Sequence, residues 1–265
     1  MQCWIISLDH DKPQPQALRN ALQQQGVDAQ FFAAVDGRQQ MPALEPGERL
    51  DQRRAVLLTR AALTTTQVAC YLSHLRLLRQ AYAQGLAWVC ILEEDVEIEA
   101  DFARILQELE TLPQHCELVR LMGLRVRKRK IVRQLGAGSH RLVRPERGWC
   151  GTQGYVVSRA GMARILKYGA RIVRPIDKFY DRGWEFDLKS YGVEPHLIYE
   201  QDCPSTISKP CGTAWRDQPL TTKLAFHVLK LWLSVYRDFY RLAHFREFYP
   251  ASRGSRDYGK TRRMR

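Results

Sequence analysis

The sequence predicts an α/β fold, in which strands and helices alternate along the first half of the chain. Short apolar runs rich in branched and aromatic residues, typical of buried strands, alternate with stretches of helical periodicity through residue 122. This alternation is typical of a doubly wound α/β layer. The chain has 265 residues and a hydrophobic content of 45%, which fits one large domain or one domain with an appendage.

Strand and helix signals follow one another in the N-terminal half. They predict, in order, strand 3–8, helix 13–25, strand 30–35, helix 65–84 and strand 87–92. The long helix begins at a capping box, in which Thr64 and Gln67 stand three residues apart before an apolar run. Residues 38–60 contain prolines, a glycine and mixed charges, and are expected to form a mobile excursion.

The pattern continues with shorter elements after residue 95. It predicts helix 101–112, strand 118–122, strand 151–158, helix 159–168 and a helix that opens at 175–177. Residues 125–147 are rich in Arg and Lys and are expected to form an exposed hairpin or loop.

A basic amphipathic segment ends the chain. One helical stripe is apolar and consists of Leu224, Val228, Leu231, Trp232, Val235, Phe239 and Leu242. Basic residues beside such a stripe, with Trp and Tyr, are typical of a membrane-surface anchor. Packing of the stripe on the parent domain is the alternative. Residues 253–265 are expected to be disordered. We therefore divide the chain into a domain of residues 1–220 and an extension of residues 221–265.

The charge and the cysteines narrow the choice of partners and compartment. The formal net charge of +13 favours nucleic acid, anionic membranes or phosphorylated substrates. No stretch approaches the roughly 18 uninterrupted apolar residues of a membrane span. The chain enters its first strand at once, which predicts a strand there and not a signal peptide. Seven cysteines without metal-ligand spacing indicate a reducing, cytoplasmic compartment.

Three consecutive acids, Glu93, Glu94 and Asp95, follow strand 87–92. They lie at a strand end, where open α/β sheets bind their ligands. Because side chains alternate along a strand, Glu93 and Asp95 are expected to project together and Glu94 to face the other way. Two carboxylates on one face suit a hard divalent cation, especially if phosphates complete its octahedron. A solvated acidic turn is the alternative.

Six motifs occur in a fixed order along roughly residues 1–210. They are Ile-Ile-Ser-Leu-Asp at 5–9, Ala-Val-Asp-Gly at 34–37, the segment from Leu-Thr to Leu-Ser-His at 63–74, Leu-Glu-Glu-Asp-Val at 92–96, Gly-Thr-Gln-Gly-Tyr-Val-Val-Ser at 151–158 and Pro-Ile-Asp at 175–177. In this order they resemble glycosyltransferase family 25. That family includes lipooligosaccharide galactosyltransferases of Gram-negative bacteria and collagen galactosyltransferases. The chain departs from it at Glu94, where the family usually has Asp, and at 66–70, where Thr-Gln-Val-Ala-Cys replaces Gly-Glu-Ile-Gly-Cys.

The resemblance implies a GT-A-like α/β/α sandwich that binds a nucleotide sugar. It implies inverting transfer of a hexose, with galactose expected, from a UDP-sugar to an acceptor hydroxyl on lipopolysaccharide core. Asp95 is the first candidate metal ligand, joined by Glu93, for Mn²⁺ or Mg²⁺ that stabilises the diphosphate leaving group.

Donor-binding candidates lie at strand ends and on two helices. They are Ser7, Leu8, Asp9, Arg19, Asp36, His74, Glu93 and Glu94. A carboxylate at Asp36 can accept ribose hydroxyls, with a turn-forming Asp before glycine as the alternative. Arg19 either reaches phosphate or stays solvated on its helix. His74 either bonds in the donor pocket or is a structural histidine.

Inversion by direct displacement needs a general base for the proton of the acceptor hydroxyl. Asp177 is the leading candidate because the resemblance includes it, and a helix N-cap is the alternative. Glu185 and Asp187 are further candidates. Trp184 either stacks on an acceptor sugar or is a buried structural residue.

Two other functions fit parts of the sequence. A nucleic-acid-binding protein would explain the basic segments but not the acids or the ordered motifs. A metal-dependent nucleotidyltransferase or hydrolase would share the α/β layout, but the sequence has no P-loop, HExxH or GxSxG motif. The favoured hypothesis places a glycosyltransferase at the anionic inner face of the bacterial inner membrane. There a phosphate-rich lipid-linked acceptor would attract its Lys and Arg side chains, each worth about 1 kcal/mol.

Overall fold

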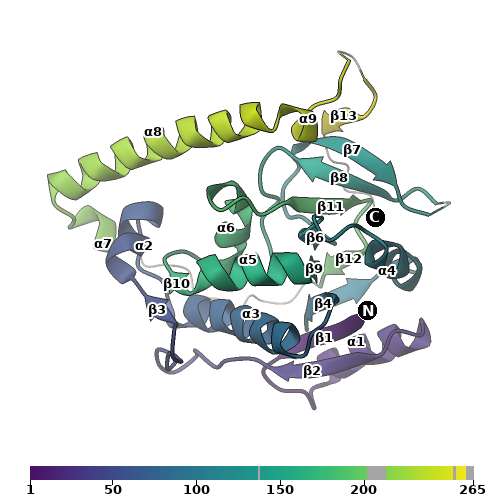
Figure 1. Cartoon of the computed structure of the whole chain (residues 1–265). Helices are drawn as coiled ribbons and strands as arrows, with labels where there is room; N and C mark the ends of the chain where they lie inside the picture. The colour runs from purple at the N-terminus through teal and green to yellow at the C-terminus, as the bar shows by residue number, and fades with distance from the viewer. Residues whose placement is uncertain (137, 202–212, 253–254, 261–265) are drawn as a thin grey trace.

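A nine-stranded mixed sheet organises the structure, a computed structural model that describes residues 1–136, 138–201, 213–252 and 255–260 (Figure 1). Its strands are β1 (Gln2–Ser7), β2 (Ala29–Ala33), β4 (Trp88–Glu93), β6 (Leu118–Arg120), β7 (Lys128–Gln134), β8 (Arg141–Pro145), β9 (Gly154–Ser158), β11 (Ser190–Glu194) and β13 (Tyr258–Lys260). They lie in the order β13-β7-β8-β11-β6-β9-β4-β1-β2. Two further pairs are β3 (Arg49–Leu50) with β10 (Arg171–Ile172), and β5 (Val96–Ile98) with β12 (Ile198–Glu200).

Helices cover both faces of this sheet. One face carries α1 (Pro13–Gln24) and α4 (Phe102–Glu110), and the other carries α3 (Thr65–Ala83), α5 (Arg159–Gly169) and α6 (Ile176–Asp181). The remaining helices are α2 (Gln52–Thr59), the short 3₁₀ helix η1 (Gly183–Glu185), α7 (Thr213–Arg216), α8 (Leu220–Ala243) and α9 (Phe245–Phe248).

The side chains of β1 show how the sequence builds two cores. Cys3 and Ile5 join the buried cluster beneath α1 and α4, whereas Trp4 and Ile6 join the cluster beneath α3 and α5. Strand alternation thus fills both faces of the sheet with apolar side chains. The predicted α/β/α sandwich is confirmed.

The strand directions bring several chain segments to one edge. β1 runs parallel to β4, with Ile6 opposite Glu93, so both strands end at the same edge. β9 runs antiparallel to β4, with Gly154 opposite Leu92, so β9 begins where β4 ends. The acids after β4 therefore meet the end of β1 and the loop before β9.

Helix α3 begins at the predicted capping box, which is confirmed. Thr64 Oγ1 accepts the Gln67 backbone N–H at 3.2 Å, and the Gln67 side chain accepts the Thr64 N–H at 3.2 Å. Gln and Glu are interchangeable in this motif, so Gln67 preserves the helix start. Gly37 packs against the same turn, where an added Cβ would lie 2.4 Å from the Thr65 carbonyl oxygen.

Residues 38–60 differ from the irregular excursion expected there, because they contain β3 and α2. The buried carboxylate of Glu48 fixes the preceding loop to α3, 2.9 Å from Arg76 Nη2 and 3.2 Å from Arg79 Nη2. Burial acts to raise the pKa of Glu48, but its bonds with Arg76 outweigh burial and lower it. A long-range ion pair orders a segment that is locally polar.

The basic segment 125–147 forms the expected hairpin, β7–β8, but its exposure is only partial. Arg129 is buried and its Nη2 donates to Glu194 Oε1 at 2.9 Å. Arg144 is also buried, over the ring of Phe248. The hairpin continues the central sheet instead of standing free, because β8 pairs with β11.

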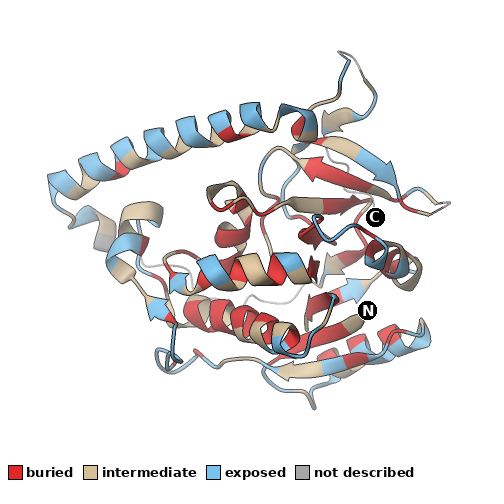
Figure 2. Cartoon of the chain, viewed as in Figure 1, coloured by how far each residue is buried: buried red, intermediate tan, exposed pale blue. Residues whose placement is uncertain are grey.

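The C-terminal extension crosses one end of the molecule as α8 (Figure 1). The seven apolar residues of the predicted stripe are all exposed, from 47% for Val235 to 67% for Leu224 and Leu231. Packing of this stripe on the domain is therefore wrong; Phe226 and Tyr240, on another side of α8, are the residues that it buries (Figure 2). Within the residues that the structure describes, no helix is both long and apolar enough to span a membrane.

The end of the chain returns to the sheet. β13 pairs antiparallel with β7, so Tyr258–Lys260 are ordered where disorder was expected. Residues 253, 254 and 261–265 of the predicted disordered end lie outside the described residues.

Candidate active site

The three acids lie where β4 ends, and Glu93 is held by two neighbouring elements. Thr152 Oγ1, just before β9, donates to Glu93 Oε1 at 2.6 Å, and His74 Nε2 of α3 lies 3.3 Å from the same oxygen. Burial acts to raise the pKa of Glu93, but the bonds with His74 and Thr152 outweigh it and lower the pKa. Glu93 is therefore an anchored carboxylate.

Glu94 faces the other way, toward β1, as strand alternation predicts. Ser7 Oγ donates to Glu94 Oε2, and the same hydroxyl accepts the Asp9 backbone N–H at 3.2 Å. The longer arm of Glu94, compared with Asp, spans this distance to β1. Leu8 and Asp9 follow in an exposed turn, in which Asp9 Oδ1 accepts the Asp11 N–H at 3.3 Å.

One carboxylate oxygen of Asp95 lacks a hydrogen-bond partner in the part of the chain that the structure describes. Its Oδ1 is buried and has no hydrogen-bond partner among the described residues. Burial, and then the charges of Glu93, Glu200 and Glu94, raise the pKa of Asp95 to about 7. A buried carboxylate oxygen that lacks a donor and is repelled by its neighbours fits a divalent cation. Asp95, with Glu93 as the neighbour whose charge acts on it most, is therefore a candidate oxygen ligand for Mn²⁺ or Mg²⁺.

A second group that could hold a metal ion consists of Cys70, His74 and Glu93, whose ligand atoms lie within 4.8 Å of one another. Burial, and then the charges of Glu93, Asp177 and Asp95, raise the pKa of the Cys70 thiol well above its ordinary value. A metal-bound cysteine must be a thiolate, which these surroundings oppose. The oxygens of Asp95 and Glu93 suit a hard cation better by their chemistry, whereas Cys70, His74 and Glu93 are the group whose ligand atoms lie close together.

His74 is a buried member of a hydrogen-bonded chain. Its Nδ1 lies 2.8 Å from the Tyr155 hydroxyl, which lies 3.1 Å from the Tyr180 hydroxyl of α6. With the contact between His74 and Glu93, this chain connects the acids to α6. The structure supports the structural interpretation of His74 and also places it beside Glu93.

Asp177 lies near the acids on α6. Its charge, with those of Glu93 and Asp95, raises the pKa of the Cys70 thiol, so the three carboxylates share one neighbourhood. The N-cap alternative is wrong, because the N-cap is Pro175 and Asp177 lies inside the first turn. Asp177 Oδ2 is 3.2 Å from Lys178 Nζ.

The other two candidates for the base are engaged elsewhere. Glu185 pairs with Arg174 Nη1 at 2.8 Å and with Arg182. Asp187 accepts the Tyr240 hydroxyl of α8 at 2.7 Å and lies 3.0 Å from Lys189 Nζ. Through these contacts both carboxylates stabilise η1 and the extension. The structure does not bring them to the acid cluster, which consists of Glu93, Glu94 and Asp95.

Trp184, Asp36 and Arg19 occupy three further environments. Trp184 is half-buried, with its ring 5.6 Å from that of Tyr236 on α8. Asp36 accepts the backbone N–H of Arg38 at 2.9 Å and the Arg38 side chain at 2.7 Å, and these bonds lower its pKa to about 2. This supports the turn-forming interpretation of Asp36. Arg19 lies 5.3 Å from the ring centre of Phe31, exposed on α1.

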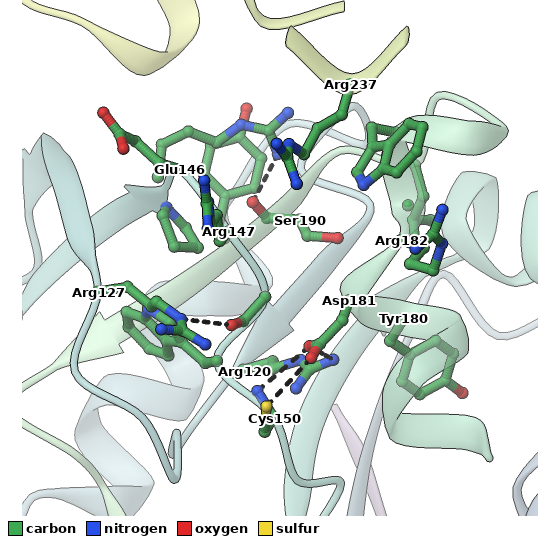
Figure 3. A pocket seen from close by; sticks show the side chains of 18 of the residues that line it. Arg120, Arg127, Glu146, Arg147, Cys150, Tyr180, Asp181, Arg182, Ser190 and Arg237 are labelled. Carbon is green, nitrogen blue, oxygen red and sulfur yellow. Dashed lines mark hydrogen bonds and ion pairs between the residues drawn. The ribbon is translucent and has the colours of Figure 1, made fainter. Parts of the chain in front are cut away.

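A cavity of about 410 Å³ lies beyond α6, between the loop after β8, η1 and α8 (Figure 3). Arg120 stands at its base, where its Nη2 lies 2.9 Å from Asp181 Oδ1 and its Nη1 donates to the Gly151 carbonyl at 2.7 Å. Sequence reasoning missed this cavity. The run of basic residues at 125–130 marked only one of its walls.

The family model described as "Glycosyltransferase family 25 (LPS biosynthesis protein)" matches residues 1–180. The chain belongs to glycosyltransferase family 25. This membership favours glycosyl transfer over the nucleic-acid-binding and nucleotidyltransferase or hydrolase alternatives. The matched region contains the acid cluster and Asp177.

The similarity extends to bacterial and animal proteins. The chain is 29% identical over 179 residues to the lacto-N-neotetraose biosynthesis glycosyltransferase LgtE of Neisseria gonorrhoeae, covering 63% of this chain and 60% of that protein. It is 24% identical over 218 residues to procollagen galactosyltransferase 1-A of Xenopus laevis, covering 75% of this chain and 35% of that protein. The match thus spans less than two thirds of either relative. A solved glycosyltransferase involved in the glycosylation of the major capsid of PBCV-1 covers 63% of the chain at 10% identity with a TM-score of 0.31.

Proposed function

We propose that the chain transfers a hexose from a UDP-sugar to the core of a lipopolysaccharide or lipooligosaccharide, with inversion and with Mn²⁺ or Mg²⁺. Family membership supports glycosyl transfer, and the family description, which names LPS biosynthesis, supports a lipopolysaccharide acceptor. The similarity to a procollagen galactosyltransferase supports galactose. The observation that carries the proposal is the buried, unpartnered Asp95 oxygen beside Glu93 at the edge of the sheet.

The residues of the acid cluster would have different roles in donor binding. Asp95 and Glu93 would hold the divalent cation, which supplies Lewis-acid stabilisation of the departing nucleoside diphosphate. His74 and Thr152 fix the Glu93 carboxylate by hydrogen bonds and so preorganise this face. Ser7 and Glu94 fix the turn after β1, which carries Asp9, and Asp36 follows β2 at the same edge. The turn after β1 and Asp36 would bind uridine and ribose hydroxyls.

Asp177 would act as the general base. In an inverting displacement the acceptor oxygen forms a bond to the anomeric carbon while the bond from that carbon to the donor phosphate oxygen breaks. The acceptor hydroxyl proton passes to a carboxylate, here Asp177. Lys178 stands 3.2 Å from this carboxylate, and although burial opposes it, the pairing raises the pKa of Lys178. A cation beside Asp177 limits how freely its side chain can turn away.

The exposed stripe of α8 supports attachment to an anionic membrane surface at the cytoplasmic face. Leu224, Val228 and Leu231 are each more than 60% exposed, with Lys223 and Lys230 close by in the sequence. An apolar stripe flanked by basic side chains inserts at the lipid headgroup boundary while its charges meet anionic lipids. Attachment there would hold the enzyme against a lipid-linked acceptor.

A donor and acceptor screen tests the proposal. Purified protein is incubated with each UDP-hexose and with core oligosaccharide, in Mn²⁺ and then in EDTA. Transfer of one hexose that requires Mn²⁺, with inverted anomeric configuration by NMR, supports the proposal. Absence of transfer from every UDP-hexose, or transfer from a different nucleotide sugar, would refute it.

A further inference from the structure

The cavity beyond α6 is strongly positive. Nine Arg and Lys side chains line it against two acids, Glu146 and Asp181. Asp181 is already paired with Arg120 at 2.9 Å, and Glu146 accepts the Tyr258 hydroxyl and lies 3.9 Å from Arg241. Arg144, Lys178, Arg182 and Arg237 pair with acids outside the lining, which are Glu247, Asp177, Glu185 and Asp238. The nine cations still exceed these six acids, so the chemistry of the cavity matches an anionic ligand.

Several buried donors on residues of the cavity wall lack acceptors. Arg144 Nε, Arg182 Nη2 and Arg241 Nε have no hydrogen-bond partner in the described parts of the chain, and neither have Trp149 Nε1 and Ser190 Oγ. The Arg144 side chain is 3% exposed and Trp149 is 1% exposed. Buried donors are rarely left without acceptors in proteins. These five atoms are themselves enclosed, so a ligand in the cavity would be bound by the exposed guanidinium groups of its wall, such as that of Arg147, which pair well with phosphate.

The cavity adjoins the proposed base. Lys178 lines the cavity and contacts the Asp177 carboxylate, and Tyr180 lines it and bonds to Tyr155. From Tyr155 the hydrogen-bonded chain continues through His74 to Glu93. Asp177 therefore adjoins the cavity through Lys178, and its charge acts on the same Cys70 thiol as the charges of Glu93 and Asp95. Because a general base must contact the acceptor hydroxyl, the cavity lies on the acceptor side.

We propose that this cavity is a subsite for a phosphate monoester carried by the acceptor close to the hydroxyl that is glycosylated. The inference rests on the proposed function and names the acceptor class as phosphorylated oligosaccharide. The donor diphosphate is the other possible source of phosphate, and the acid cluster with its cation is the site built for it. Arg147, from the loop after β8, and Arg237, from α8, reach toward the same space and would hold the phosphate (Figure 3).

The test compares lipopolysaccharide core oligosaccharide before and after enzymatic dephosphorylation. The variant is Arg147→Gln with Arg237→Gln, because Arg147 is exposed and Arg237 half-buried, so the fold does not depend on them. The control is Arg133→Gln, which removes an exposed guanidinium from β7 outside the cavity. Thermal unfolding confirms that both variants are folded.

Wild type and control are expected to have a KM for the phosphorylated acceptor about tenfold below that for the dephosphorylated one. The double variant is expected to lose this difference, with kcat and the KM for UDP-sugar unchanged. Equal KM values for the two acceptors in wild type would overturn the proposal. A rise in the KM for UDP-sugar alone would overturn it too, by assigning the cavity to the donor.

Calorimetric titration of the same two oligosaccharides without donor keeps the test independent of transfer. Phosphate-dependent binding that the double variant loses supports the subsite even where no UDP-hexose is transferred, a result in which the proposed function alone fails. Equal affinity for the phosphorylated and the dephosphorylated oligosaccharide overturns the subsite even where transfer occurs.

Discussion

The acid cluster and the cavity both have contacts or charges in common with the neighbourhood of Asp177, and they differ in charge and in construction. The acid cluster consists of three consecutive residues, and burial, followed by the neighbouring negative charges, raises the pKa of Asp95. The cavity carries an excess of positive charge gathered from the β8 loop, α6, η1 and α8. The difference in charge supports the proposal that a cation-dependent donor site and an anion-binding acceptor site both adjoin one base.

The largest expected effect concerns the acid cluster. Asp95→Asn keeps the shape of the side chain but removes the charge that holds the cation. We expect kcat to fall on the order of 1,000-fold, since stabilisation of the leaving group contributes several kcal/mol. Steady-state kinetics with saturating Mn²⁺ measure this. Asp28→Asn, on an exposed loop, is the matched control and should keep wild-type activity. Retained activity in Asp95→Asn would place the metal site elsewhere.

The next effect concerns the residue whose neighbourhood the two regions share. Asp177→Asn should lower kcat about 100-fold, because loss of a general base removes assistance to proton transfer. UDP affinity, measured by calorimetry, should not change. Glu185→Gln tests the alternative base, and its kcat should stay within a few-fold of wild type. A larger loss in Glu185→Gln than in Asp177→Asn would reverse the assignment.

A smaller effect concerns the outer face of α8, behind the cavity wall. Leu231→Asp should weaken binding to anionic vesicles about tenfold. It removes a 67% exposed apolar side chain from the stripe and adds a negative charge that the anionic lipids repel. Sedimentation with phosphatidylglycerol vesicles measures this. Met41→Asp, at another exposed apolar site, is the control. Equal binding by both variants and wild type would remove α8 as the anchor.

The smallest effect is the pH dependence of stability. The pKa of Asp95 is about 7 in the folded protein, above the unfolded value of about 3.9. The folded state therefore holds this proton more tightly, and the stabilisation present below about pH 4 is lost as the pH rises toward 7. We expect the Tm of metal-free protein to fall a few degrees more between pH 5 and pH 8 than that of Asp95→Asn. Identical slopes in the two proteins would contradict the origin assigned to this shift.

The sequence predicts the acid cluster well because its determinants are local. An apolar run sets β4, alternation separates Glu94 from Glu93, and Thr64 with Gln67 starts α3 where predicted. Those rules need only neighbouring residues. They also identified Asp177 on its helix, but only the resemblance to family 25 connected it to the acids.

The cavity and the partners of the acids could not be predicted because they depend on tertiary contacts. Arg120 and Asp181 are 61 positions apart in the sequence, and Thr152 and Glu93 are 59 positions apart. β11, with the polar sequence SYGVE, gave no apolar run to mark it, yet it forms the wall that carries Ser190. The exposed stripe of α8 shows the reverse case. Helical periodicity predicted the helix and its apolar stripe correctly, but it could not reveal whether the stripe packs on the domain or stays exposed.

The binding of UDP with and without Mn²⁺ tests the central claim most directly, because it needs neither acceptor nor turnover. Calorimetric titration of UDP into wild-type protein is carried out in Mn²⁺ and again in EDTA. The account predicts binding in Mn²⁺ that EDTA abolishes and added Mn²⁺ restores. Equal UDP affinity in both conditions would contradict a donor site built on Asp95 and Glu93.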